Sequence, residues 1–170
     1  MSSSPYPPVT LLPATIEHLE ALQRGRDELA AMLSTEVPDA WPAFPESVPF
    51  TLDRLRRHPD EAGWWMHLFL GPATGALIGS GGFAGPPADR TVELGYEIAP
   101  AFRGRRFGVG AAAALLDKAA ASGEVDAVIA HTMPEPSAST RVLAGLGFVR
   151  EAELTVPDEG PVARWRRELG

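Results

Sequence analysis

The stretch Glu93–Ala121, ELGYEIAPAFRGRRFGVGAAAALLDKAAA, holds a strand, a turn and a helix in immediate succession. Alternating residue types predict the strand, with Glu93, Gly95 and Glu97 on one face and apolar residues on the other. Pro100 ends the strand because proline has no N–H group for a sheet ladder. The alanine- and leucine-rich end of the stretch predicts a helix.

The turn between this strand and helix, RGRRFGVG at residues 103–110, is basic and contains three glycines. A turn that leads into a helix has unpaired N–H groups, and the helix dipole adds partial positive charge there. Glycines let a phosphate group approach the backbone closely. The arginines Arg103, Arg105 and Arg106 favour a diphosphate or polyphosphate over a single carboxylate. We therefore expect an anion site at this turn.

The run RGRRFGVG after ELGYEIAPAF resembles the pyrophosphate loop of the GCN5-related N-acetyltransferases (GNAT), which use acetyl-CoA. The later run HTMPEPSASTRVLAGLGF resembles the second half of the same signature. Together with FAGPPADRTVELGYEI and VPDAWPAF upstream, these runs most resemble the ribosomal-protein-alanine acetyltransferase-like branch. The resemblance covers most of the chain from Leu11 onward.

The loop motif of that family, Arg/Gln-x-x-Gly-x-Gly/Ala, fits this sequence in two registers. One register begins at Arg103 and places Arg106 where the middle glycine is expected. The other begins two residues later, at Arg105, and uses two true glycines. We prefer the first register because it keeps the usual spacing from Pro100.

The resemblance implies a mixed α/β fold, with a mostly antiparallel central sheet of about six or seven strands, splayed at the CoA site and flanked by about four helices. Residue patterns predict strands at 9–12, 64–70, 76–83, 91–99, 127–132, 148–154 and 162–168. Helices are expected at 16–33, at 52–58 after a Thr51 cap, at 107–122, and from Ser137 or Ser139 to Gly147. We expect residues 1–8 to be a flexible N-terminus and residues 9–170 to form a single acetyltransferase domain.

The resemblance also implies which residues bind acetyl-CoA. The pantetheine arm is expected to lie along the end of the central strand, at Glu97, Ile98 and Ala99. The phosphates are expected at Arg105, Arg106, Phe107, Gly108, Val109 and Gly110, in a turn shaped by Arg103 and Gly104. Most of these contacts should come from backbone N–H groups.

A general base would remove the proton of the acceptor amine. Glu93 matches the position at which related enzymes place a base glutamate, and Glu97 is the second candidate. Both point to the same strand face, roughly 13 Å apart by strand rise, which is too far to act as one carboxylate pair. Alternatively, Glu93 pairs with a cross-strand arginine or with solvent.

The residue that would donate a proton to the departing thiolate does not follow the usual pattern of the family. Many relatives use a tyrosine at the position of Leu143, whereas relatives in the ribosomal branch use a serine that matches Ser139. Ser139 could equally be a helix N-cap, or do both. The asparagine usual in this loop is replaced by Pro136, which removes a hydrogen bond to the pantetheine.

Three other side chains have alternative interpretations. Trp41 and Phe44, in the proline-broken loop 39–45, either line a substrate pocket or pack onto the domain. His131 lies on a strand near the expected path of CoA, where a histidine is more often simply packed. No histidine or carboxylate spacing indicates a metal site.

The composition excludes several classes of function. The 170 residues include 45 % hydrophobic and 22 % charged residues, as in ordinary globular proteins. The absence of cysteine excludes disulfides, thiolate metal sites and a cysteine nucleophile. A net charge of −7 argues against nucleic acid as the main partner. The sequence shows neither a membrane span nor a secretory signal, so we expect a cytoplasmic protein.

We therefore expect an acyl-CoA N-acyltransferase that moves an acetyl group from acetyl-CoA to a primary amine by direct attack. The acceptor is either a peptide or protein α-amine, as in the ribosomal branch, or a small-molecule amine. The competing hypothesis is a CoA-binding module of weak or no activity, which Leu143 and Pro136 favour and which Glu93 and Ser139 oppose. Homodimerisation is left open.

Overall fold

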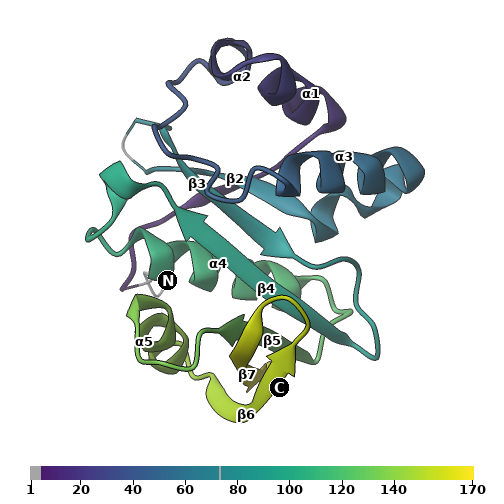
Figure 1. Cartoon of the computed structure of the whole chain (residues 1–170), viewed down its shortest axis with the longest axis vertical. Helices are drawn as coiled ribbons and strands as arrows, with labels where there is room; N and C mark the ends of the chain where they lie inside the picture. Colours follow the sequence, from purple (N-terminus) through teal and green to yellow (C-terminus); the bar gives the residue numbers. More distant parts are fainter. Residues whose placement is uncertain (1–4, 73) are drawn as a thin grey trace.

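The computed structural model describes residues 5–72 and 74–170 (Figure 1). Its strands are β1 (Thr10–Pro13), β2 (Met66–Leu70), β3 (Leu77–Phe83), β4 (Thr91–Ile98), β5 (Ala127–Thr132), β6 (Val149–Val156) and β7 (Gly160–Glu168). Its α-helices are α1 (Ile16–Arg24), α2 (Arg26–Leu33), α3 (Ser47–Arg57), α4 (Phe107–Ala121) and α5 (Ala138–Gly145). Two short 3₁₀ helices are η1 (Pro59–Trp64) and η2 (Pro100–Phe102).

The seven strands form one sheet in the order β1-β2-β3-β4-β5-β7-β6. Every pairing is antiparallel except that of β4 with β5. This parallel ladder joins Thr91–Glu93 to Ala127–Ile129, whereas β4 continues to Ile98 and β5 to Thr132. The expected fold class, including a sheet that splays at its centre, is confirmed.

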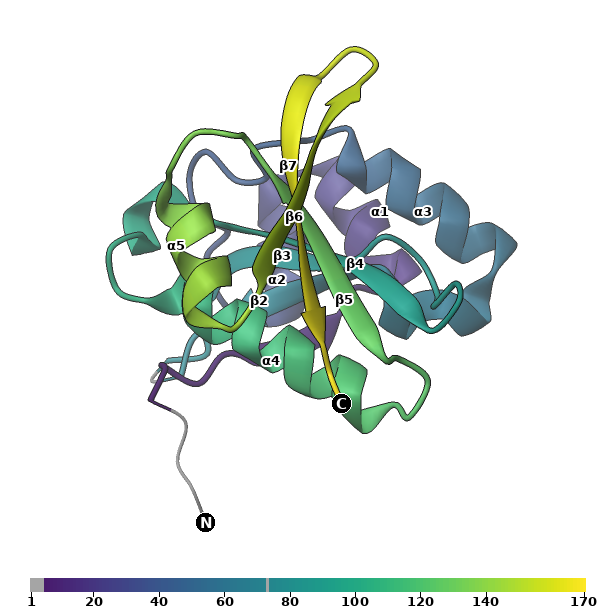
Figure 2. The same cartoon turned by 90° about the horizontal axis from the view of Figure 1, so that it is seen from below.

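Two apolar cores cover the two faces of the sheet. Neighbouring residues in a strand point to opposite faces, so in β2 Leu68 packs with α1 and α3, while Phe69 packs with α4. Figure 2 shows α4 on one side of the sheet and α1 and α3 on the other. Leu115 of α4 is fully buried in the first core. The central strand β4 lies between these two cores.

The helices before the sheet differ from the prediction. The single helix expected at 16–33 is wrong, because Gly25 is extended (φ 160°, ψ 155°) and separates α1 from α2. The helix expected to follow a Thr51 cap begins earlier, at Ser47, and Thr51 is buried within it. Residues 59–64, partly expected to be strand, form η1.

The described part of the N-terminus packs against α4. The flexible segment expected at residues 1–8 includes residues 1–4, which lie outside the described residues. A Cβ atom added to Gly110 of α4 would lie 2.3 Å from the carbonyl oxygen of Pro7. Pro7 therefore lies directly against the helix. Among the described residues, no helix is long and apolar enough to cross a membrane.

Candidate active site

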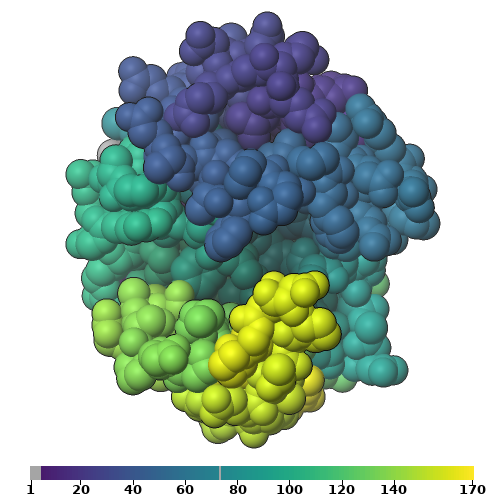
Figure 3. All heavy atoms as spheres, viewed as in Figure 1, coloured from purple at the N-terminus to yellow at the C-terminus, as the bar shows by residue number. Residues whose placement is uncertain are grey.

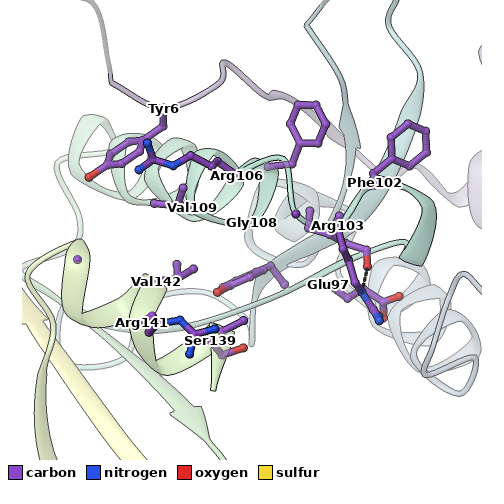
Figure 4. Close-up of a pocket in the computed structure, with 16 residues that line it drawn as sticks. Tyr6, Glu97, Phe102, Arg103, Arg106, Gly108, Val109, Ser139, Arg141 and Val142 are labelled. Atoms are coloured by element: carbon purple, nitrogen blue, oxygen red, sulfur yellow. Dashed lines mark hydrogen bonds between the residues drawn. The ribbon is translucent and has the colours of Figure 1, made fainter. Parts of the chain in front are cut away.

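A cavity of about 670 Å³ lies between the end of β4, the start of α4 and α5. Figure 4 shows side chains from all three elements around it. It is lined by eight of the eleven residues expected to bind the cofactor: Glu97, Ile98, Arg103, Gly104, Arg106, Phe107, Gly108 and Val109. The splay of the sheet opens this space, because β5 no longer pairs with β4 beyond Glu93.

The N-terminus of α4 faces this cavity without a side-chain cap. Thr15 caps α1 and Ser137 caps α5, each by accepting a hydrogen bond from a backbone N–H group. At α4 the N-cap residue is Arg106, whose side chain makes no cap hydrogen bond, and the first turn contains no acidic residue. Free N–H groups and the helix dipole together suit an anion.

Three arginines add positive charge to the same cavity: Arg103, Arg106 and Arg141. None of them forms an ion pair with a carboxylate among the described residues. Arg103 Nε donates to the carbonyl oxygen of Ile98 at 3.1 Å, and the Arg106 guanidinium lies 5.5 Å from the Tyr6 ring centre (Figure 4). Unpaired guanidinium groups are available to a phosphate ligand.

The backbone at Arg106 favours the first register of the loop motif. Its φ of 65° lies in the left-handed region, which glycine adopts without strain. The first register expects glycine at this position. In the second register the middle glycine would be Gly108, which lies within α4.

Three residues expected at the cofactor lie outside the cavity lining. Ala99 is buried in the core beneath α1 and α3. Arg105 stacks on the Phe102 ring at 5.7 Å. Gly110 faces the carbonyl oxygen of Pro7.

A second hollow, of about 420 Å³, lies on the opposite face of β4. Figure 3 shows it between α3 with the preceding loop, in blue, and the β6–β7 hairpin, in yellow. Its lining includes Phe44, Phe50 and Glu93. Tyr96 and Glu97 line both cavities, so the two spaces adjoin across β4.

The two candidate base carboxylates have different partners. Glu93 Oε1 lies 3.4 Å from Nδ1 of His131, on the neighbouring strand β5, and the Glu93 side chain is about half exposed. Glu97 Oε1 accepts a hydrogen bond from the Ala43 N–H group at 2.9 Å and so fixes the loop before α3. Glu93 is therefore the carboxylate in the second hollow that an amine can reach. The sequence analysis expected His131 to be simply packed and did not predict its contact with Glu93.

Hydroxyl groups gather at α5. Ser137 is the N-cap, so the alternative that Ser139 caps the helix is wrong, and Ser139 lines the first cavity instead. Leu143 is 1 % exposed and belongs to the core. The Tyr96 hydroxyl is buried beside Ser139, but it makes no hydrogen bond of normal geometry to a described residue. Burial raises the pKa of Tyr96, and the Ser139 hydroxyl partly offsets this rise.

The aromatic residues of the loop before α3 have separate roles. Trp41 is buried, and its Nε1 donates to Ser80 Oγ at 2.9 Å, so it packs in the core. Phe44 is 62 % exposed and lines the second hollow. Among the described residues, no group of three His, Cys, Asp or Glu side chains could hold a metal ion.

Four residues of the site were not predicted from the sequence: Tyr6, Tyr96, Arg141 and His131. Arg141 lies in the run HTMPEPSASTRVLAGLGF, two residues after Ser139, so that run contained a signal for it. The parallel register pairs Glu93 with Ile129, and only this register reveals that His131 lies near Glu93. Tyr96 is on the strand face opposite Glu97, where an apolar role was expected.

Comparison with known proteins agrees with this geometry. The family model described as an acetyltransferase (GNAT) domain matches residues 9–149. A search of curated protein sequences finds no significant match. The chain belongs to the GNAT family, whose members transfer an acetyl group from acetyl-CoA to an amine.

Solved structures share the fold at low sequence identity. A Salmonella typhimurium acetyltransferase that modifies the N-terminal serine of ribosomal protein L7/L12 is 18 % identical, with 98 % of this chain and 97 % of that chain covered and a TM-score of 0.67. The ribosomal L7/L12 α-N-protein acetyltransferase RimL, in complex with coenzyme A, is 18 % identical over 98 % and 96 %, with a TM-score of 0.70. A variant of the Vibrio cholerae spermidine N-acetyltransferase SpeG is 18 % identical over 94 % and 93 %, with a TM-score of 0.68.

Proposed function

We propose that this acetyltransferase acts on the α-amine of a peptide or protein, with acetyl-CoA in the first cavity and the acceptor in the second hollow. The observation that carries the proposal is that the two spaces adjoin at Tyr96 and Glu97. A thioester from one side and an amine from the other can meet only there.

The first cavity suits acetyl-CoA. Its loop end offers the uncapped start of α4 and the guanidinium group of Arg106 to the phosphates, and Arg103 and Arg141 add positive charge elsewhere in the cavity. Beyond Glu93, the edge of β4 that faces β5 is outside the ladder between these strands. Main-chain groups there are available to the pantetheine amides and to the developing oxyanion.

Glu93 is proposed as the general base. Its carboxylate removes a proton from the amine, directly or through water, and His131 beside it holds the carboxylate in place. The neutral nitrogen then attacks the thioester carbonyl, so that a C–N bond forms and the C–S bond breaks. Glu97 is proposed to position the acceptor loop through Ala43 rather than to act as base.

The second hollow favours an α-amine over a polyamine. A polyamine carries several positive charges, but of the two carboxylates that line the hollow, Glu97 is already bonded to Ala43. The exposed rings of Phe44 and Phe50 offer an apolar wall for the first side chain of a peptide. An α-amine also loses its proton more easily, since its ordinary pKa is about 7.7–8.0 against about 10.4 for a lysine side chain. The name of the RimL relative supports the same acceptor class.

The test is a panel of acceptors analysed by mass spectrometry after incubation with acetyl-CoA. The panel holds peptides with free N-termini, the same peptides with blocked N-termini and one internal lysine, and spermidine. The proposal predicts acetylation of the free N-termini in preference to the other acceptors. Preferential acetylation of spermidine or lysine would overturn the assigned acceptor class. A cytoplasmic location stays a prediction from the sequence.

A further inference from the structure

The Tyr96 hydroxyl is buried beside Ser139 and makes no hydrogen bond of normal geometry to a described residue. Its ring packs against the start of α4, where a Cβ atom added to Gly108 would lie 3.5 Å from Tyr96 Cε2. Burial of a hydroxyl without a hydrogen bond costs free energy, so buried polar groups are nearly always paired. An exception inside a substrate cavity suggests that the substrate supplies the partner.

The position of Tyr96 within the cavity indicates which part of the substrate it meets. The phosphates are assigned to the other end, where Arg106 lies beside Tyr6 and away from Ser139 (Figure 4). Tyr96 instead lines both the first cavity and the second hollow. The thioester must reach this junction to meet the amine, so its sulfur atom passes Tyr96.

The neighbouring helix offers Tyr96 a route to solvent. Ser137 is the N-cap of α5, so the Ser139 hydroxyl does not cap the helix and lies beside the phenol. Ser139 is exposed at the cavity mouth. Leu143, one turn later on the same helix, is an apolar core residue and cannot donate a proton. The two hydroxyls thus form a short chain from the junction to water.

We propose that Tyr96 donates the proton that the departing CoA thiolate needs, and that Ser139 relays its replacement from solvent. As the C–S bond breaks, the electron pair stays on sulfur, and the proton of Tyr96 Oη moves to it to give the free thiol. The phenolate regains a proton through Ser139, while Glu93 releases the amine proton to water. Because burial raises the pKa of Tyr96, its hydroxyl holds a proton throughout the neutral range.

This proposal rests on the proposed function and is tested first by Tyr96→Phe. Tyr96→Phe removes one oxygen atom that makes no hydrogen bond of normal geometry to a described residue, so the fold should be as stable as in the wild type. We expect kcat to fall by about 100-fold, as for loss of a general acid, with acetyl-CoA affinity within about threefold. Wild-type turnover in a folded Tyr96→Phe variant would overturn the proposal.

A second measurement uses the intact protein and does not depend on turnover. The chain has two tyrosines, so labelling with 3-fluorotyrosine gives two ¹⁹F resonances, which Tyr6→Phe assigns. We expect the Tyr96 resonance to shift differently with CoA and with desulfo-CoA, and the Tyr6 resonance to shift equally with both. If the Tyr96 resonance shifts equally with the two ligands while the Tyr6 resonance responds, the CoA site stands but the proposed role of Tyr96 as proton donor is rejected. No shift of either resonance would reject the CoA site itself, and the proposal with it.

Discussion

Arg106 combines a strained backbone with a charge directed at the cofactor cavity. Its left-handed conformation costs an ordinary residue about 1–2 kcal/mol. Arginine is nevertheless present where glycine would fit without strain. The guanidinium lines the cavity and stacks on Tyr6, so we attribute its presence to ligand binding rather than to folding.

Substitution of Arg106 should separate binding from stability. Arg106→Glu places negative charge beside the pyrophosphate and should weaken CoA binding at least about tenfold in calorimetry. Arg106→Gly should also weaken binding, yet raise the free energy of unfolding by about 1 kcal/mol, because the strain is relieved.

Arg105→Glu is the matched control for this prediction. It makes the same change of charge one residue away, at a side chain that stacks on Phe102 outside the cavity. Its effect on CoA affinity should be clearly smaller. Equal losses in Arg105→Glu and Arg106→Glu would mean that the net charge of the loop, and not contact by Arg106, controls affinity.

At the residue scale, the sequence predicted the candidate base residues but not the residues that contact them. Alternation in β4 placed Glu93 and Glu97 on one face, which the shared second hollow agrees with. The partners His131 and Ala43 come from another strand and from a loop 54 residues away from Glu97. No local pattern encodes such contacts, because they depend on sheet register and loop packing.

At the element scale, the backbone of β3 lies so close to neighbouring backbone that Gly81 and Gly82 have no room for a side chain. A Cβ atom on Gly81 would lie 2.4 Å from the carbonyl oxygen of Gly95, and one on Gly82 would lie 1.9 Å from that of Trp65. This contact fixes β3 against β4, the strand that carries the site.

Gly81→Ala should therefore lower the free energy of unfolding by about 3 kcal/mol, measured by denaturant titration, because backbone atoms must move to admit the methyl group. Gly95→Ala is the control in the adjacent strand, since nothing lies within 4 Å of its added Cβ atom. It should change stability by less than about 1 kcal/mol. Similar losses in both variants would contradict the close approach of β3 and β4.

Elements were predicted well where one pattern dominates and less well elsewhere. The period-two strands and the alanine-rich α4 lie close to their expected bounds. The break between α1 and α2 was missed because apolar residues keep helical spacing on both sides of Gly25. The start of α3 was missed because Pro49, which ends helices in their interior, is tolerated in a first turn.

At the scale of the whole molecule, a buried polar pair joins α4 to the sheet. His67 of β2 is fully buried, its Nδ1 lies 3.1 Å from the Trp65 carbonyl oxygen, and its Nε2 lies 2.5 Å from Nζ of Lys118. These contacts fit a neutral imidazole that donates to the carbonyl and accepts from the ammonium group. Burial, and then the Lys118 charge, lower the pKa of His67 to about 4.

This shift predicts acid sensitivity of the fold. Between pH 6.5 and about 4, the His67 side chain is protonated in the unfolded chain but stays neutral in the folded protein. The free energy of unfolding should therefore be highest above pH 6.5 and fall as the pH drops, by up to about 3 kcal/mol from this group. Denaturant titrations across this range measure the slope.

His67→Gln should flatten this slope, because glutamine can keep both hydrogen bonds but does not titrate. His58→Gln is the control, since His58 is exposed on the surface. It should retain the wild-type dependence on pH. An unchanged slope in His67→Gln would show that other groups cause the acid sensitivity.

The arrangement of the whole molecule places two substrates on opposite faces of one strand. The cofactor cavity lies between β4, α4 and α5, and the acceptor hollow lies between α3 and the β6–β7 hairpin. The family resemblance predicted the splayed sheet that makes this possible. It could not supply the shape of the acceptor hollow, which depends on loops packed from distant parts of the chain.

The most direct test of this account is the rate of thiol release from acetyl-CoA with a peptide acceptor, compared between wild type and Glu93→Gln, alongside acetyl-CoA affinity from calorimetry. Because Glu93 is in the acceptor hollow, the account predicts a fall in turnover of about 100-fold or more with affinity nearly unchanged. Loss of affinity together with turnover would show that Glu93 holds the fold or the cofactor site, and wild-type turnover in Glu93→Gln would contradict its role as base.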